Sequence, residues 1–193
     1  MADGTHGIDA LLAALSAYQP GNPVESADVD RLRSLATAGD PWRQSAPLHA
    51  TASALVVHPP SGRVLLRWHA RQRAWLQVGG HADPGESDPL AVAVREAAEE
   101  TNLADLVPWA DARIVHVAVV PVPAARHEPA HEHADIRFAL ATERPDAARP
   151  EKPGADLCWL TVPEARAITT HDNLRETLTR VERLMIAHAR RRA

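Results

Sequence analysis

Hydrophobic residues recur at helical spacing near the start of the chain and again near its end. The i, i+3, i+4 pattern predicts short amphipathic helices at residues 7–18 and 27–38, and a longer helix at residues 172–190. The first two helices are rich in Ala and Leu. We expect such a pair to pack on the domain that follows it or on a partner subunit.

Between these helices the pattern changes to short apolar runs that are typical of strands. Residues 51–58 and 63–68 are two such runs around a Pro-Pro-Ser-Gly turn, and they predict a hairpin. Further strands are predicted at residues 75–78, 114–120, 131–140 and 157–161. A short helix is predicted from Pro163, because Thr161 and Glu164 have the spacing of a capping box. Strands combined with a central and a terminal helix indicate a mixed α+β domain.

The central helix is predicted directly after a Gly-rich segment. Asp88 is a favourable N-cap residue, and Pro89 suits the first helical position. Asn102 can adopt the left-handed conformation that ends a helix. An apolar stripe for packing on a core is formed by Leu90, Val94, Ala97 and Thr101.

Three carboxylates gather on the other side of this helix, near its C-terminal end. A step of ~100° per residue places Glu96, Glu99 and Glu100 together. Each like-charge pair costs about 0.2–0.5 kcal/mol, and the helix dipole opposes each acid by about 0.3–1 kcal/mol. Arg95 offsets part of this cost. A solvated acidic face is the simpler interpretation, but three acids beside a Gly-rich turn favour a divalent-cation site, and carboxylates suit Mg²⁺ or Mn²⁺ better than Zn²⁺.

The segment from Gly80 to Leu103 resembles the signature box of the Nudix hydrolase family. That box reads Gly, five residues, Glu, seven residues, Arg-Glu, two residues, Glu-Glu, one residue and Gly. The matching positions here are Gly80, Glu86, Arg95, Glu96, Glu99 and Glu100. Eight residues separate Glu86 from Arg95, and Asn102 replaces the final Gly. The extra residue precedes the helix, so the acidic face is intact and the position of Glu86 is left open.

The resemblance implies an α/β/α sandwich with a mixed sheet. It implies a Nudix domain at residues 47–193, preceded by an N-terminal helical extension at residues 1–46. It also implies hydrolysis of a diphosphate bond with Mg²⁺ or Mn²⁺ as cofactor. The implied metal ligands are Glu96, Glu99, Glu100 and a carbonyl of the turn at Gly80, and the implied catalytic residues are the same three acids with Arg95, which orients them. The general base is left open among Glu96, Glu99 and Glu132.

A second polar group includes His127, His131, Glu132, His133 and Asp135. On a strand, His131, His133 and Asp135 share one face. Three interpretations remain open. The first is an exposed His-rich edge. The second is a transition-metal site, since His-x-His-x-Asp resembles the motif of metallo-β-lactamase-type hydrolases, although Ile136 stands where that motif has a His. The third is that the group lines the Nudix pocket. We favour the third, in which His131, Glu132, His133 and Asp135 contact the substrate.

Two further side chains are candidates for substrate contact. Trp68 and Trp75 shortly precede the Gly-rich turn, where an aromatic ring could stack on a nucleobase, although core packing is the commoner role of Trp. Arg67, Arg71 and Arg73 could bind phosphates or face solvent. We take Arg67 and Trp75 as the candidate substrate-binding residues.

The composition narrows the choice of partners. The 193 residues carry a net charge of −4 at pH 7, which gives no general attraction to nucleic acids or anionic membranes. Cys158 is the single cysteine, so no intramolecular disulfide can form, which fits a reducing compartment. The chain shows neither a signal peptide nor a membrane-length apolar run, and we expect a cytoplasmic protein.

Three functional hypotheses of different class follow. The favoured one is a Mg²⁺-dependent pyrophosphohydrolase acting on a nucleoside diphosphate linked to another moiety. The alternative is a Nudix-fold module that senses a nucleotide without hydrolysis, against which the intact acids argue. A third is an isoprenyl diphosphate isomerase, which would need a cysteine at the site, whereas Cys158 lies on the predicted late strand. We also expect the N-terminal helix pair to support a homodimer.

Overall fold

The structure is a computed structural model that describes residues 3–125 and 128–192. Its strands are β1 (Leu48–His58), β2 (Arg63–His69), β3 (Ala74–Leu76), β4 (Val78–Gly80), β5 (Val107–Trp109), β6 (His116–Val122), β7 (His131–Ala141) and β8 (Leu157–Thr161). Its α-helices are α1 (Asp3–Ala17), α2 (Pro23–Ala38), α3 (Pro89–Thr101), α4 (Val162–Ile168) and α5 (Asp172–Arg192), with short 3₁₀ turns at Pro59–Ser61 and Pro145–Ala147.

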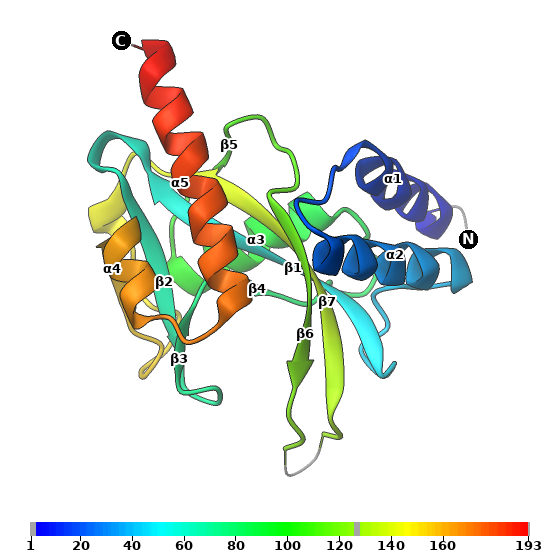
Figure 1. Cartoon of the computed structure of the whole chain (residues 1–193). Coiled ribbons are helices and arrows are strands. Elements are labelled where there is room, and N and C mark those ends of the chain that lie inside the picture. Colours follow the sequence, from blue (N-terminus) through cyan, green and yellow to red (C-terminus); the bar gives the residue numbers. More distant parts are fainter. Residues whose placement is uncertain (1–2, 126–127, 193) are drawn as a thin grey trace.

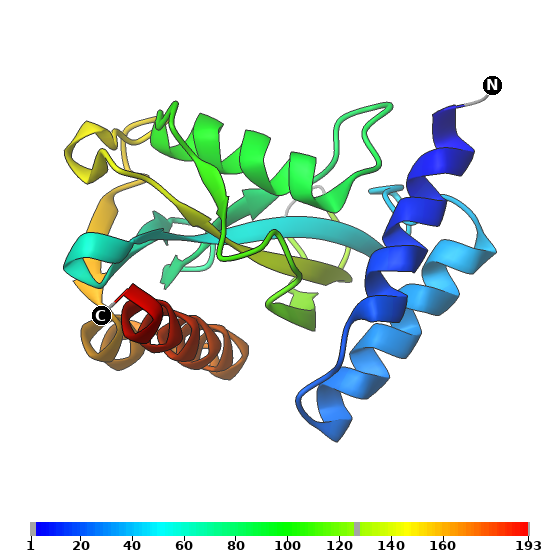
Figure 2. The ribbon, with the colours of Figure 1, turned by 90° about the horizontal axis from the view of Figure 1, so that it is seen from above.

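The strands of this part form one mixed sheet, with β3, β2, β1, β7 and β5 in that order. β4 pairs with β1, β6 with β7, and β8 with β2. Figure 2 shows α3 on one side of the sheet and α5 on the other. The mixed α+β sandwich expected from the sequence is therefore confirmed. No helix within the described ranges is long and apolar enough to cross a membrane.

The centre of the sheet is the parallel pair β1 and β7, which runs from Leu48 beside Glu132 to Val57 beside Ala141. Successive side chains point to opposite faces of a strand. Even-numbered residues of β1, such as Ala54, accordingly pack in the core under α3. Odd-numbered residues near its end, such as Leu55, pack in the core under α5. Both faces of the strand are covered, which explains why β1 is a nearly continuous apolar run.

The ends of α3 form as the sequence predicts. The side chain of Asp88 accepts a hydrogen bond from the backbone N–H of Leu90 at 2.9 Å. Asn102 adopts a left-handed conformation with φ of 55°, and its N–H donates to the carbonyl of Ala98 at 2.8 Å. These caps fix where the acidic end of the helix lies.

The N-terminal helices pack on the domain, side by side at one end of the sheet (Figure 1). Their apolar side chains, which include Leu11, Leu15, Val29, Leu32 and Ala36, are buried in the same core as the central strands. The carboxylates of Glu25 and Asp28 on α2 accept hydrogen bonds from Val117 N–H at 3.1 Å and Val119 N–H at 3.0 Å, along the edge of β6. Of the two expected arrangements, the helix pair thus packs on the domain that follows it, and the homodimer stays a prediction.

Several element bounds differ from the sequence predictions. The N-terminal helices begin earlier, and the strand expected at 114–120 is β6, shifted by two residues. The strand expected at 75–78 is divided between β3 and β4, because the chain leaves β2 and then pairs with β1. β5 was not predicted, because it is three residues long and contains Pro108, which strands rarely accommodate.

Candidate active site

The acidic end of α3 lies against the turn formed by Gly79 and Gly80 on β4. The backbone N–H of Gly79 donates to Oε2 of Glu100 at 3.1 Å. A Cβ atom at Gly80 would lie 2.6 Å from the carboxyl carbon of Glu96, so only glycine allows this approach. Gly79 has a φ of +147°, and a Cβ there would meet the Cβ of Ser53 at 2.3 Å. The two glycines therefore bring two carboxylates against the backbone.

Arg95 contacts three carboxylates of the box, which include that of Glu96. Its Nε and Nη2 contact the two oxygens of Glu86 at 3.0 and 2.9 Å. Its Nη1 donates to Glu96 Oε1 at 3.0 Å and to Glu99 Oε2 at 3.2 Å. Nη2 also donates to the carbonyl of His81 at 2.8 Å. The sequence left the position of Glu86 open, and the structure places its carboxylate in an ion pair with Arg95.

Glu100 is held by a different arginine. Nη1 of the buried Arg67 lies 3.2 Å from Glu100 Oε1, and Nη2 lies 3.4 Å from Glu151 Oε2. The three acids of the helix end are therefore each paired with a guanidinium, Glu96 and Glu99 with Arg95 and Glu100 with Arg67.

Burial changes the titration of two of these acids. It raises the pKa of Glu100 to about 7, and the charge of Glu96 adds to this, while Arg67 and the Gly79 N–H oppose it. Burial also raises the pKa of Glu96, with Arg95 opposing. A bound cation would stabilise the charged form of both groups. Buried carboxylates held against a glycine turn, with raised pKa values, fit a hard divalent cation such as Mg²⁺.

The polar face of β7 is divided between two structural groups. Asp135 is buried and accepts hydrogen bonds from Thr51 Oγ1 at 3.1 Å, Ser53 Oγ at 2.9 Å, Gln77 Nε2 at 3.1 Å and Arg137 Nε at 2.8 Å. These bonds join β1, β7 and the β3–β4 junction. A substrate contact of Asp135 stays a prediction, and its oxygens already have several donors.

His131 and His133 belong to the other group, in which they meet His49 of β1 and His81, the residue after β4. The Nε2 atoms of His49 and His81 are 3.0 Å apart, and those of His131 and His133 are 3.1 Å apart. Burial lowers the pKa of His49 and of His81, and with the neighbouring histidines it lowers that of His133 to about 3. His127 lies outside the described residues.

Two other candidates lie apart from these groups. Glu132 is on the opposite face of β7 from His131 and His133, where Arg31 of α2 donates to it at 3.2 Å. Trp75 packs edge-on against Trp68, with ring centroids 5.6 Å apart, on the β2–β3 hairpin. Sequence reasoning missed Gln77, His49 and His81, because no local motif links them to β7.

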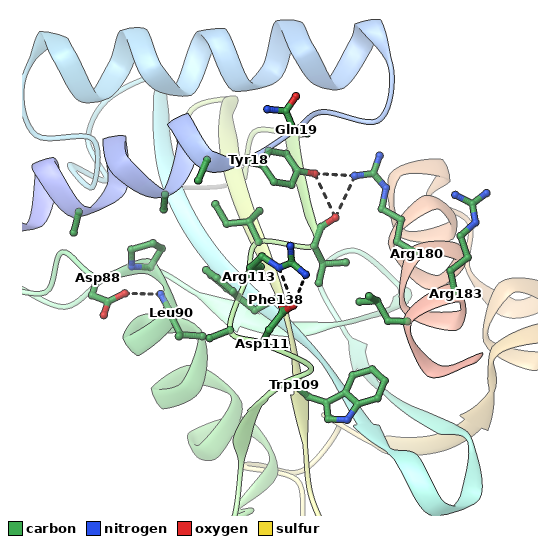
Figure 3. Close-up of a pocket in the computed structure, with 18 residues that line it drawn as sticks. Tyr18, Gln19, Asp88, Leu90, Trp109, Asp111, Arg113, Phe138, Arg180 and Arg183 are labelled. Carbon is green, nitrogen blue, oxygen red and sulfur yellow. Dashed lines mark hydrogen bonds and ion pairs between the residues drawn. The ribbon is translucent and has the colours of Figure 1, made fainter. Parts of the chain in front are cut away.

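A cavity of about 650 Å³ lies between α1, the start of α3 and α5 (Figure 3). Tyr18 and Arg180 meet at its wall, where Arg180 Nη1 lies 2.8 Å from the Tyr18 hydroxyl. Its lining includes Asp88 and Leu90 at the N-terminal end of α3. The acids of the box are at the other end of that helix, so this cavity is separate from the acidic site.

The comparisons with known proteins agree with this geometry. Residues 47–181 match the model of the NUDIX domain. The chain therefore belongs to the Nudix family. It is a Nudix-type hydrolase, the class that cleaves pyrophosphate bonds. A search of curated proteins gives no match.

Solved structures show the same fold. A C. elegans Ap4A hydrolase in a binary complex is 19% identical, covers 72% of this chain and 98% of its own, and has a TM-score of 0.58. An E. coli dihydroneopterin triphosphate pyrophosphohydrolase is 18% identical, with coverages of 69% and 92% and a TM-score of 0.52. A Nudix hydrolase from M. smegmatis, RenU, is 21% identical, with coverages of 72% and 86% and a TM-score of 0.52. At these identities the likeness defines the fold.

Proposed function

We propose that this protein is a Mg²⁺-dependent pyrophosphohydrolase that cleaves the diphosphate bond of a nucleoside diphosphate linked to another moiety. The observation that carries the proposal is the placement of Glu96 and Glu100 against the Gly79–Gly80 turn. Burial there disfavours the charged form of Glu100 and raises its pKa to about 7. Such a site is suited to a cation, because a bound cation favours the charged form of the carboxylate and lowers its pKa again.

Glu96, Glu99 and Glu100 would hold Mg²⁺ or Mn²⁺, with a carbonyl of the turn at Gly80 adding an oxygen ligand. The ion, when bound, neutralises phosphate charge and lowers the pKa of water. Arg95 positions Glu96 and Glu99 through one nitrogen and is itself fixed by Glu86. Arg67 neutralises Glu100 in the absence of a cation, and its guanidinium could turn to a substrate phosphate once Glu100 binds metal.

The general base is assigned to the acids of α3. Burial raises the pKa of Glu96 toward the range in which a carboxylate accepts a proton efficiently. Glu99 is the second choice, as its side chain is 56% exposed and shares the Arg95 Nη1 contact with Glu96. Glu132 ranks third, because its ion pair with Arg31 lowers its pKa.

The substrate is proposed to be a small nucleotide derivative. Two of the three neighbours described above are an Ap4A hydrolase and a dihydroneopterin triphosphate pyrophosphohydrolase, which supports a small phosphoanhydride as substrate here. Trp75, His131, His133 and Asp135 remain the proposed substrate contacts beside Arg67, and Glu132 is proposed among them. The net charge of −4 supports neither a nucleic acid nor a membrane partner. The single Cys158 supports a cytoplasmic location.

A substrate panel tests the proposal. The full chain is incubated with nucleoside triphosphates, nucleotide sugars, dinucleoside polyphosphates and CDP-alcohols, with Mg²⁺, with Mn²⁺ and with chelator. We expect release of a nucleoside monophosphate from at least one class, and only with a divalent ion. Tight binding of a nucleotide with no product from any class would instead establish the sensing module. Isomerisation of an isoprenyl diphosphate that is lost in Cys158→Ala would establish the isomerase.

A further inference from the structure

Four histidines from three separate segments converge at one end of the sheet. His49 is near the start of β1, His81 directly follows β4, and His131 and His133 begin β7. Their ring centroids lie 4.8–5.3 Å apart in the five pairs that are in contact. His49 and His133 are register partners in the parallel pairing of β1 with β7, so the sheet itself places two of the four rings side by side.

The tautomers of two rings are fixed by backbone carbonyls. Nδ1 of His49 lies 2.9 Å from the carbonyl oxygen of Ala46, and Nδ1 of His131 lies 2.9 Å from that of Pro129. A carbonyl oxygen only accepts hydrogen bonds, so each Nδ1 carries the proton. With the proton on Nδ1, Nε2 is the atom of each ring that is left to bind a metal. A histidine that ligates a metal is commonly held in this way by an outer carbonyl.

Each of these two Nε2 atoms faces another ring of the group, and that of His131 also lies 3.5 Å from Oε1 of Glu128. The Nε2 of His49 meets that of His81 at 3.0 Å, and the Nε2 of His131 meets that of His133 at 3.1 Å. One ligand atom each from His49, His131 and His133 lies within 4.8 Å of the others. Four nitrogens around Zn²⁺, at Zn–N distances of about 2.0–2.1 Å, are about 3.3 Å apart at the corners of a tetrahedron. The two Nε2–Nε2 distances of 3.0 and 3.1 Å are close to this edge length, and the group of three within 4.8 Å would have to contract around an ion.

We propose that His49, His81, His131 and His133 bind a first-row transition-metal ion, represented by Zn²⁺, in a nitrogen-only site distinct from the acidic site on α3. Imidazole nitrogen suits Zn²⁺, Cu²⁺ or Ni²⁺, whereas Mg²⁺ takes oxygen ligands, so the two sites select different ions. Asp135 is not a ligand, because Thr51 and Ser53 donate to its two oxygens. The His-x-His part of the motif thus supplies two ligands, and His49 and His81 supply the other two. In this site His131 and His133 bind the ion, which replaces the substrate contact proposed for them above.

The proposed site is coupled to the catalytic turn through one residue. His81 adjoins Gly80, and its carbonyl accepts a hydrogen bond from Arg95 Nη2 at 2.8 Å. An ion on the His81 ring would join the Gly79–Gly80 turn to β1 and β7. It would thereby fix the backbone against which Glu96 and Glu100 lie. We assign the ion a role in holding this turn.

Metal binding by the full chain tests the site. Protein stripped with a chelator is titrated with Zn²⁺ in excess Mg²⁺, which saturates oxygen sites, and the bound zinc is counted by elemental analysis. Co²⁺ is then titrated in the same way, because its visible spectrum distinguishes four-coordinate from six-coordinate ions. We expect one equivalent of tightly bound Zn²⁺, a four-coordinate Co²⁺ spectrum and a rise in Tm on zinc addition.

Matched variants locate the ion. His81→Gln and His133→Gln each remove one ligand, and we expect each to weaken Zn²⁺ binding by more than ~100-fold, since loss of an outer-shell partner alone costs about 10–100-fold. His58→Gln, at the far end of the same strand β1 as His49, is the control and should bind zinc like the wild type. Glu99→Gln/Glu100→Gln should also retain the zinc site, which separates it from the acidic one.

Any of three results on metal binding would overturn the proposal. They are less than one equivalent of zinc on the wild type, a six-coordinate Co²⁺ spectrum, and unchanged zinc affinity in both histidine variants. Circular dichroism of the zinc-free variants verifies that they fold. The histidine NMR signals are also followed on addition of inorganic phosphate and of zinc. A change with phosphate and none with zinc would assign the group to an anion and would also overturn the proposal.

Discussion

The guanidinium of Arg95 contacts both carboxylate oxygens of Glu86, at 3.0 Å from Nε and 2.9 Å from Nη2. The contact forms although one additional residue separates the two positions compared with the family pattern. The additional residue lies between Glu86 and Arg95, whereas Glu86 itself is held by the turn that precedes it, in which Glu86 N–H donates to the carbonyl of Asp83 at 2.9 Å. Asp83 N–H in turn donates to Glu86 Oε2 at 2.8 Å. Glu86 therefore positions Arg95, and Arg95 positions the acids.

This relationship predicts that Glu86 and Arg95 act as a unit. Glu86→Gln and Arg95→Lys should each lower kcat by about tenfold or more with little change in KM, because each loosens the same contact. The double variant should be little worse than either single variant, since coupled residues are not additive. Steady-state kinetics with the substrate found in the panel measures this. Fully multiplicative losses would show that the two residues act independently.

The two glycines of the turn should respond differently to alanine. In Gly80→Ala the three atoms nearest to the new Cβ all belong to the Glu96 carboxyl group, which can move, so activity should fall while Tm changes little. In Gly79→Ala the new Cβ meets the backbone of Ser53 at 2.4 Å and the φ of +147° is strained, so we expect a loss of about 1–3 kcal/mol in unfolding free energy. Thermal melts and kinetics of the pair check this. Equal loss of Tm in both variants would contradict it.

The raised pKa of Glu100 predicts a pH dependence of stability in metal-free protein. Its pKa is about 7 in the folded chain and 4.5 as the ordinary value, so the folded state holds a proton that the unfolded state releases. This contribution to stability is fully present below about pH 4.5 and is lost as pH rises through about 7. Stability of the wild type should therefore fall over this window relative to Glu100→Gln. Urea unfolding in chelator at several pH values measures the difference, and parallel curves would contradict the prediction.

The same group predicts how Mg²⁺ binding depends on pH. The cation must displace the proton of Glu100 below about pH 7, so Mg²⁺ affinity should weaken as pH falls. The rise in Tm caused by Mg²⁺ should be larger at pH 8 than at pH 5.5, and Glu100→Gln should show little rise at either pH. An equal Mg²⁺ effect at both pH values in the wild type would argue against Glu100 as a ligand.

The N-terminal helices are expected to depend on one buried ion pair. Arg180 Nη2 lies 2.6 Å from Glu25 Oε2, and the Glu25 side chain is 2% exposed. Burial alone would raise the pKa of Glu25, but hydrogen bonds from Arg180, Tyr18 and two backbone N–H groups lower it to about 2. Glu25→Ala leaves Arg180 without this partner and should cost about 3–5 kcal/mol. The exposed acid Asp30, on the same helix, provides the control Asp30→Ala, which should cost less than about 1 kcal/mol.

Stability should also depend on pH through this pair, in the opposite sense to Glu100. A lowered pKa stabilises the fold above about pH 4.5, and this contribution is lost as pH falls toward 2. Acid unfolding monitored by circular dichroism should begin at higher pH in Glu25→Gln than in the wild type. Coincident acid transitions would show that Glu25 does not hold the helix pair.

The features that could be predicted from the sequence are those that depend on residues close together in the chain. The caps of α3 at Asp88 and Asn102, and the capping box of Thr161 with Glu164, follow from residues within a few positions of one another. The contact of Arg67 with Glu100 could not be predicted in this way, because it depends on how α3 lies over the sheet. The parallel pairing of β1 with β7 brings His49 beside His133, which are 84 residues apart, and no local pattern contains that information.

The most direct test of the proposed function is the hydrolysis of the selected substrate by Glu99→Gln/Glu100→Gln. Glu182→Gln is the matched control, because Glu182 is on α5, on the other side of the sheet, in a partly exposed ion pair with Arg166. Release of nucleoside monophosphate is measured at saturating Mg²⁺, with circular dichroism to verify folding. We predict that the double variant folds and loses turnover while Glu182→Gln retains it. Undiminished Mg²⁺-dependent turnover in the folded double variant would contradict the assignment of these acids.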